Sequence, residues 1–135
     1  MPMRTLIVDD SESFLAAARD VLKRSKFEVV GDATTAAQAL RLLEDLRPDL
    51  ILLDIYLGGQ SGLTLSKHLA DHFGPGTPAV VLISTYPEEE FADLIAESPA
   101  VGFIAKQDLS PRSLASLLGG HERVIRQADC QRESR

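Results

Sequence analysis

Five short apolar runs that alternate with helix-like segments constrain the fold of this chain more than any other feature. The runs are residues 4–8, 27–30, 50–53, 79–83 and 101–105. Between and after them, apolar residues recur at spacings of three and four, as on the buried face of a helix. Strands and helices that alternate strictly over short connections form a parallel sheet with helices on both faces.

The expected helices are defined by their inward-facing residues. These are Phe14, Ala17, Ala18, Val21 and Leu22 in the first helix, Ala36, Leu40 and Leu43 in the second, Leu65, Leu69 and Phe73 in the third, Phe91, Leu94 and Ile95 in the fourth, and Leu114, Leu117 and Leu118 in the fifth. Gly31 and Asp32 are expected to end the second strand, and Pro87 with the three glutamates after it to begin the fourth helix. The pattern predicts the α/β class, with a single doubly wound, five-stranded parallel sheet of the flavodoxin-like (βα)5 type.

Length and charge limit what the chain is expected to be. With 135 residues it has the size of one domain, which we place at residues 1–120, followed by a polar tail at 121–135 that is partly helical or frayed. A net charge of -6 argues against a broad grip on nucleic acid, which needs clustered lysine and arginine. Any contact with DNA is therefore expected to come from another domain or chain.

Neither a membrane segment nor a disulfide is expected. No window approaches the roughly 18 apolar residues of a membrane span, and the first residues run into a strand without a visible signal peptide. The single cysteine, Cys130, has no partner for an internal bridge and no zinc-ligand grouping around it. A cytoplasmic location without membrane contact is the expectation.

Four of the five runs end at polar residues suited to chemistry. Leu50 to Leu53 are continuously apolar, as in a central parallel strand, and a carboxylate, Asp54, follows at once, ahead of a glycine-rich loop. The other runs of this kind end at Asp9 and Asp10, at Ser84 and at Lys106. Because the carboxyl ends of parallel strands meet at one edge of a sheet, these side chains are expected in one crevice.

The chemistry of this crevice favours a bound cation and a phosphoryl group. Three carboxylates close together repel one another unless a cation is present. Magnesium suits them, because it prefers oxygen ligands and takes part of its shell from phosphate, and Mn²⁺ is the alternative. Asp10 and Asp54 are expected to ligate the ion directly, and Asp9 directly or through water. Asp54 is then the nucleophile toward a phosphoryl group whose oxygens Lys106 and Ser84 contact.

Five motifs together resemble the receiver domain of bacterial response regulators, the phosphoacceptor of two-component signalling. They are Leu-Ile-Val-Asp-Asp at 6–10, Leu-Leu-Asp-Ile at 52–55, Gly62 after the acceptor loop, Leu-Ile-Ser at 82–84 and Gly-Phe-Ile-Ala-Lys at 102–106. Each motif is weak alone, but their order, spacing and placement at strand ends make a specific match.

The resemblance implies that a sensor histidine kinase or phosphotransfer protein donates a phosphoryl group to Asp54. It implies that magnesium is held by Asp9, Asp10, Asp54 and the backbone carbonyl of Tyr56. It also implies that Ser84 moves toward the phosphoryl group and that Phe103 turns inward, which changes the surface formed by the fourth helix, the fifth strand and the fifth helix. Such a protein is a switch, not an enzyme, beyond promoting its own phosphorylation and dephosphorylation.

Several functional alternatives remain open. The chain is expected to be a stand-alone receiver whose output is an unidentified protein, a phosphate relay or a phosphorylation-dependent homodimer. The alternative is the receiver of a DNA-binding transcriptional regulator, for which the residues after Gly120 suit the start of a linker. An aspartyl-phosphate phosphohydrolase is a weaker alternative, because such enzymes carry an acid where Tyr56 stands. A nucleotide or flavin module would need a glycine-rich loop in place of Asp9 and Asp10.

Individual residues also have simpler interpretations. Asp9 and Asp10 could cap a helix, and Ser84 could cap a turn. Lys106 could be an ordinary lysine exposed to solvent at the surface. His68 and His72 have a spacing of four that can bind metal, but no third ligand is evident and a polar helix face explains both.

A few residues depart from the pattern of the family. Gly58 stands where proline is usual, and Thr85 where alanine is common. Tyr56 and Tyr86 lie two residues beyond Asp54 and Ser84, and their rings are expected to screen an aspartyl phosphate from water and so to lengthen its lifetime.

Overall fold

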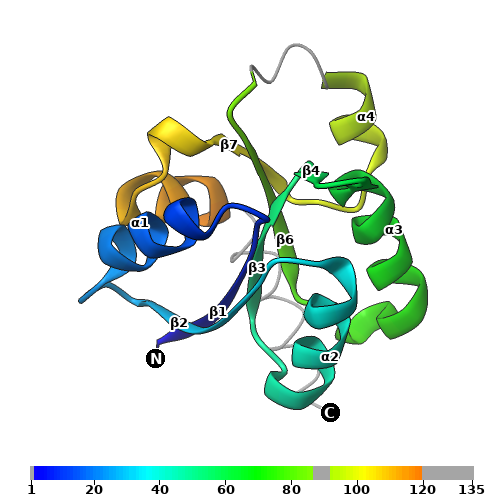
Figure 1. Ribbon diagram of the computed structural model, residues 1–135, viewed down its shortest axis with the longest axis horizontal. Coiled ribbons are helices and arrows are strands. Elements are labelled where there is room, and N and C mark those ends of the chain that lie inside the picture. Colours follow the sequence, from blue (N-terminus) through cyan, green and yellow to red (C-terminus); the bar gives the residue numbers. More distant parts are fainter. Residues whose placement is uncertain (1, 87–91, 120–135) are drawn as a thin grey trace.

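The computed structural model describes residues 2–86 and 92–119, which form a parallel sheet with helices on both faces (Figure 1). The five strands of the sheet are β1 (Met3–Val8), β2 (Phe27–Ala33), β3 (Leu50–Asp54), β6 (Ala79–Ser84) and β7 (Gly102–Ala105). Their order is β2-β1-β3-β6-β7, and every neighbouring pair is parallel. The predicted doubly wound α/β fold is confirmed, with β3 at the centre of the sheet.

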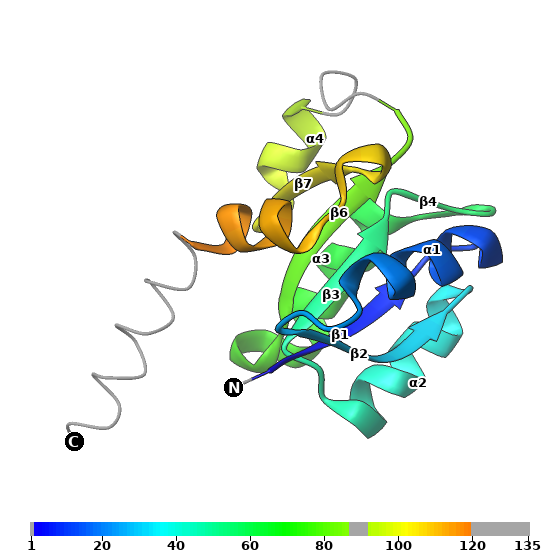
Figure 2. The same cartoon turned by 90° about the vertical axis from the view of Figure 1, so that its left-hand side faces the viewer.

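Helices cover both faces of this sheet. They are α1 (Glu12–Leu22), α2 (Ala36–Leu46), α3 (Gly62–Phe73) and α4 (Ala92–Glu97), and residues 111–119 form a further helix. Helix α1 and the helix at 111–119 pack on one face, and α2, α3 and α4 lie on the other (Figures 1 and 2). Two 3-10 turns, η1 (Gly74–Gly76) and η3 (Lys106–Asp108), follow α3 and β7.

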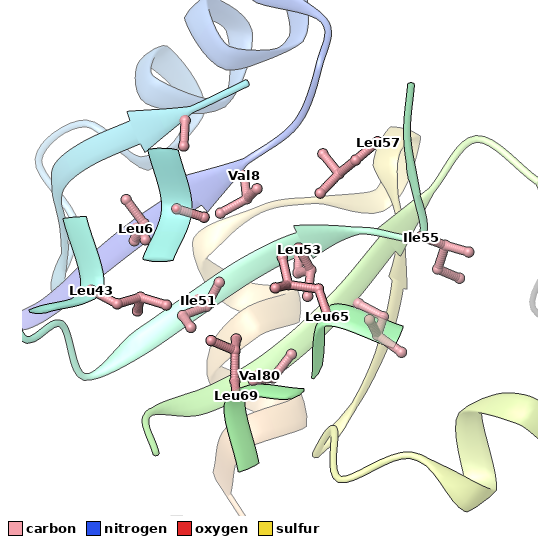
Figure 3. Packing of buried hydrophobic residues seen from close by; sticks show 13 residues of the cluster. Leu6, Val8, Leu43, Ile51, Leu53, Ile55, Leu57, Leu65, Leu69 and Val80 are labelled. Carbon is pink, nitrogen blue, oxygen red and sulfur yellow. The ribbon is translucent and has the colours of Figure 1, made fainter. Parts of the chain in front are cut away.

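The sheet divides the hydrophobic core into two layers. In one layer, strand residues such as Leu6, Ile51 and Leu53 pack against Leu43 of α2 and Leu69 of α3 (Figure 3). The other layer is formed by Ile7, Leu52 and Val81 of the sheet with Leu15 and Leu22 of α1 and Leu114 and Leu118 of the last helix. All five residues of β3 are buried, as a run without alternation predicts. Core packing on both faces of the sheet therefore holds the end of β3 in place.

The second strand is longer than the sequence predicts. β2 continues through Gly31 and Asp32 to Ala33, with a register irregularity opposite Thr5 and Leu6. The strand accommodates Asp32 because β2 is at the edge of the sheet and the Asp32 carboxylate lies 2.7 Å from Arg19 of α1. The expectation that Gly31 and Asp32 end the strand is wrong.

Three residues predicted to face inward do not do so. Val21 and Leu94 are 41% and 52% exposed, and Ala17 is also exposed. Helix α1 instead buries Leu15, Ala18 and Leu22, and α4 contacts the core through the partly buried Ile95. Helix α4 contains no buried residue, which means that little apolar burial holds it in place.

Some expectations concern residues outside the described ranges. These are the helix start at Pro87 to Glu90, the inward position of Phe91, the tail at 121–135 and Cys130. Among the described residues, none of the helices is both long and apolar enough to cross a membrane.

Candidate functional site

Charged side chains gather where β1, β3 and β7 end. Asp9 follows β1, Asp54 is the last residue of β3, and Lys106 follows β7. Asp9 and Asp54 are buried, with 0% and 4% exposed, whereas Asp10 is exposed. Because β1 and β3 are paired neighbours in the sheet, their two acids lie side by side, as the strand-end pattern predicts.

Lys106 joins the two buried acids. Its Nζ lies 2.6 Å from Oδ2 of Asp9 and 3.2 Å from Oδ2 of Asp54. Burial works against the charged amine, but the contact with Asp9 and the charges of Asp54 and Asp9 outweigh it and raise the pKa of Lys106 above its ordinary value of 10.5. Lys106 therefore keeps its positive charge at neutral pH.

The carboxyl group of Asp54 is less acidic than an ordinary aspartate. Burial raises its pKa from 3.8 to about 6, and the negative charge of Asp9 adds to this effect. A hydrogen bond from the backbone N–H of Tyr56 to Oδ1 and the charge of Lys106 act in the opposite direction. The Tyr56 N–H and Lys106 therefore only partly offset the cost of a negative charge on the buried Asp54 carboxylate.

Three carboxylates are arranged as ligands for a cation. Asp9, Asp10 and Asp54 each offer an oxygen, and these oxygens all lie within 4.8 Å of one another. Among the described residues, Oδ2 of Asp9 is buried without a hydrogen bond of good geometry, although Lys106 lies close to it. A set of three neighbouring carboxylates, two of them buried, fits a hard divalent cation such as Mg²⁺. The donor set agrees with the magnesium prediction.

The loop after β3 forms a small hairpin that was not anticipated from the sequence. Its strands are β4 (Tyr56–Leu57) and β5 (Gln60–Ser61), which pair antiparallel and extend from the end of β3 (Figure 2). The glycines between them, Gly58 and Gly59, are the signal that was available, since paired glycines favour two-residue hairpin turns. Gly58 has φ +58 and donates its N–H to Oδ2 of Asp10 at 3.0 Å.

Gly62 allows this loop to return close to the site. Its N–H donates to the carbonyl of Ile55 at 2.7 Å. A side chain at Gly62 would overlap the backbone carbonyl oxygen of Asp54, so only glycine fits without displacing the acid.

The residues predicted to act as the switch lie on the neighbouring strands. Ser84 is buried at the end of β6, and its Oγ accepts a hydrogen bond from the N–H of Tyr86 at 3.0 Å. Phe103 of β7 is partly buried and packs against the core layer beneath α2 and α3. The rings of Tyr56 and Tyr86 meet edge to face, with centroids 5.6 Å apart and about half of each residue exposed. Thr85 is exposed.

One further contact was missed because the sequence offers no signal for it. Nζ of Lys106 lies 4.7 Å from the ring centroid of Phe14, which helical spacing identifies only as an inward residue of α1. His68 and His72 both lie on α3, where their rings stack with centroids 6.1 Å apart, and His72 also lies 3.5 Å from Glu44 of α2.

Comparison with known proteins gives a consistent family assignment. The model of the response regulator receiver domain matches residues 5–118. The DNA-binding transcriptional activator EvgA of Escherichia coli (strain K12) is 24% identical over 106 residues, which cover 78% of this chain and 51% of EvgA. A protein-glutamate methylesterase/protein-glutamine glutaminase 5 of Myxococcus xanthus is 35% identical over 117 residues, or 85% of this chain and 32% of that protein. The chain thus spans about half or less of the length of these relatives.

Solved structures agree with the sequence comparison. The signal receiver domain of the response regulator NarL from Mycobacterium tuberculosis superimposes with a TM-score of 0.76 and 26% identity, covering 90% of this chain and 97% of that one. Aspartate phosphorylation and magnesium binding in two-component signalling are typical of this family. With the family model matched over most of its length, the chain belongs to the response regulator receiver domain family.

Proposed function

We propose that this protein is a phosphorylation-dependent signalling switch whose phosphoacceptor is Asp54. The observation that carries the proposal is the position of Asp54 at the end of the central strand, with the Lys106 ammonium 3.2 Å away and two further carboxylates beside it. A sensor histidine kinase or a phosphotransfer protein is the proposed donor. The proposed compartment is the cytoplasm, without direct contact of these residues with nucleic acid or membrane.

The proposed transfer needs positioning and positive charge. A carboxylate oxygen of Asp54 attacks phosphorus and forms a P–O bond, while the bond to the donor's leaving group breaks and takes its electron pair with it. Tyr56 N–H holds Oδ1 of Asp54, and Lys106 faces Oδ2, so the acceptor is oriented before the donor arrives. Lys106 then offers its charge to the phosphoryl oxygens.

Asp9, Asp10 and Asp54, with the backbone carbonyl of Tyr56, are the proposed ligands of Mg²⁺, for which Mn²⁺ is the alternative. The ion supplies positive charge beside the phosphoryl oxygens when bound. Support comes from the three clustered carboxylates, of which Asp9 and Asp54 are buried.

Ser84 and Phe103 are the proposed switch residues. Movement of Ser84 toward a phosphoryl group would break its hydrogen bond with the N–H of Tyr86. Phe103 would then turn inward, and the surface of α4, β7 and the helix at 111–119 would change. Helix α4 suits this role because it has no buried residue and shifts at low cost. The phosphoryl group must favour one of two conformations for any signal to pass.

We propose that the surface of α4, β7 and the helix at 111–119 passes the signal to the next component of the pathway. EvgA is named as a DNA-binding activator and the Myxococcus relative as a methylesterase, so receivers of this kind act with different outputs. For this chain the candidates are an unidentified target protein, a phosphorylation-dependent homodimer and a DNA-binding output domain. No catalytic activity on other substrates is proposed, because Tyr56 occupies the place of the general acid that a phosphohydrolase needs.

The decisive experiment is phosphorylation by acetyl phosphate in Mg²⁺, followed by intact mass. We expect one phosphoryl group to be added to the wild-type protein and none to Asp54→Asn or to protein in EDTA. No mass gain, or an equal gain in Asp54→Asn, would refute the proposal. Rapid release of phosphate from many substrates would favour a phosphohydrolase instead.

A further inference from the structure

The ring of Phe14 lies against the ammonium group of Lys106. Nζ is 4.7 Å from the ring centroid, within the roughly 6 Å over which a cation is attracted to an aromatic face. Phe14 is partly buried against the core layer of α1, and the Lys106 side chain is only 13% exposed. Because water is largely excluded, the attraction is stronger than at an exposed site.

Hydrogen bonds connect Phe14 to the same acid that Lys106 contacts. Oδ1 of Asp9 accepts the N–H of Ser11 at 2.8 Å, and the Ser11 hydroxyl accepts the N–H of Phe14 at 3.3 Å. Oδ2 of Asp9 lies 2.6 Å from Nζ of Lys106. The four residues form a closed ring of contacts, so the first turn of α1 is fixed relative to the ammonium as well as to the core.

The two carboxylate contacts of the ammonium must change when a phosphoryl group arrives, whereas the aromatic contact need not. Oδ2 of Asp54 faces the ammonium, and Asp9 belongs to the cation cluster. We propose that Phe14 is a positioning residue for phosphoryl transfer, whose ring face keeps the Lys106 ammonium beside Asp54 while its carboxylate contacts are exchanged for a phosphoryl oxygen. This inference rests on the proposed function of Asp54.

Two substitutions at Phe14 separate the aromatic face from apolar volume. Phe14→Leu keeps an apolar side chain without a ring, and Phe14→Tyr keeps the ring. We expect the initial rate of Asp54 phosphorylation by acetyl phosphate to fall roughly threefold to tenfold in Phe14→Leu and to stay within about twofold in Phe14→Tyr. The Mg²⁺ dissociation constant should change by less than about twofold in both, because the ring offers the ion no ligand.

A matched control measures the effect of core damage alone. Leu22→Val removes a methylene from the same core layer at the far end of α1. This variant is expected to lose stability while keeping the wild-type rate of phosphorylation. An equal fall in rate in Leu22→Val and Phe14→Leu would overturn the positioning role.

A second readout needs neither phosphate nor metal. Ring current from Phe14 should shift the ε-methylene proton signals of Lys106 upfield in NMR spectra of the wild-type and Phe14→Tyr proteins, and the shift should vanish in Phe14→Leu. Absence of the shift in the wild type, or an unchanged phosphorylation rate in Phe14→Leu, overturns the inference alone. If the shift is present but no protein is phosphorylated, the proposed function of Asp54 fails, and the positioning role fails with it.

Discussion

The backbone N–H of Gly58 donates a hydrogen bond to Oδ2 of Asp10 across 3.0 Å, which ties the loop after β3 to an acid after β1. Gly58 adopts φ +58 to make this contact. Proline at this position could not make the contact, because it has no N–H and a φ fixed near -65°. The chain therefore orders this loop by a hydrogen bond and a hairpin.

Substitution of Gly58 should destabilise the protein, and proline should destabilise it more than alanine. We expect Gly58→Ala to lower the free energy of unfolding by about 1 kcal/mol, because a Cβ is strained at positive φ. Gly58→Pro should cost more, about 2 kcal/mol, because it also removes the N–H that Asp10 accepts. Denaturant unfolding measures both. Gly59→Ala is the control, since a Cβ there meets no atom within 4 Å, and a loss as large as that of Gly58→Ala would contradict the explanation.

The raised pKa of Asp54 predicts a pH-dependent gain in stability when its charge is removed. The folded protein binds the proton more tightly than the unfolded chain, since the pKa is about 6 against 3.8. Protonation of Asp54 therefore adds stability that is fully present below pH 3.8 and is lost as pH rises through about 6. Without metal, Asp54→Asn should be more stable than wild type above pH 7, by up to about 3 kcal/mol.

Urea unfolding in EDTA at pH 7.5 and at pH 4 tests this difference. The stability gain of Asp54→Asn should shrink at the lower pH, where the wild-type carboxyl is largely protonated. Asp71→Asn, which removes an exposed acid of α3, should show no such pattern. A gain that is the same at both pH values would argue against a buried, poorly compensated charge.

Magnesium should stabilise the folded protein through the carboxylate cluster. With free Mg²⁺ ten times above its dissociation constant, mass action adds about 1.4 kcal/mol, which raises the melting temperature measured by calorimetry. Asp10→Asn should abolish this increase with little loss of metal-free stability, because Asp10 is exposed. Sodium chloride at equal ionic strength controls for screening. A full magnesium effect in Asp10→Asn would remove that residue from the ligand set.

The edge-to-face tyrosines predict a long-lived phosphorylated state. The rings of Tyr56 and Tyr86 contact each other two residues beyond Asp54 and Ser84, and we expect them to limit the approach of water to an aspartyl phosphate. Tyr56→Asn and Tyr86→Ala should each speed loss of the phosphoryl group severalfold, measured by mass after removal of acetyl phosphate. Tyr56→Phe and Tyr86→Phe keep the rings and should behave like wild type. An unchanged rate in the first two variants would refute the screening role.

The strand ends were predictable because charge follows an apolar run abruptly. Asp9 and Lys106 come directly after strands β1 and β7, Asp54 ends β3, and the parallel sheet brings the three together. In contrast, the inner face of α1 was only partly predictable. Ala18 and Leu22 were correctly predicted to face inward, but Ala17 and Val21 were not, and Leu15 was missed, because the packing against the sheet and the last helix sets which face of α1 is buried.

Contacts away from the strand ends, between segments distant in sequence, could not be predicted. The extension of β2 past Gly31 depends on the ion pair between Arg19 and Asp32. The contact between Phe14 and the Lys106 ammonium depends on the position of Lys106 at the end of β7. The roles of Ser84, Phe103 and the Tyr56 carbonyl remain predictions, because they concern a phosphorylated or metal-bound state. Local pattern thus predicts which residues reach the edge of the sheet, whereas tertiary packing determines what each one contacts there.

The tyrosine pair also gives the protein an intrinsic fluorescent probe at the candidate site. The chain contains no tryptophan, and its two tyrosines are Tyr56 and Tyr86, which contact each other at the candidate site. Tyrosine fluorescence of the unmodified protein therefore arises entirely beside Asp54. Binding of a cation or arrival of a phosphoryl group should therefore be observable in real time without attaching a dye.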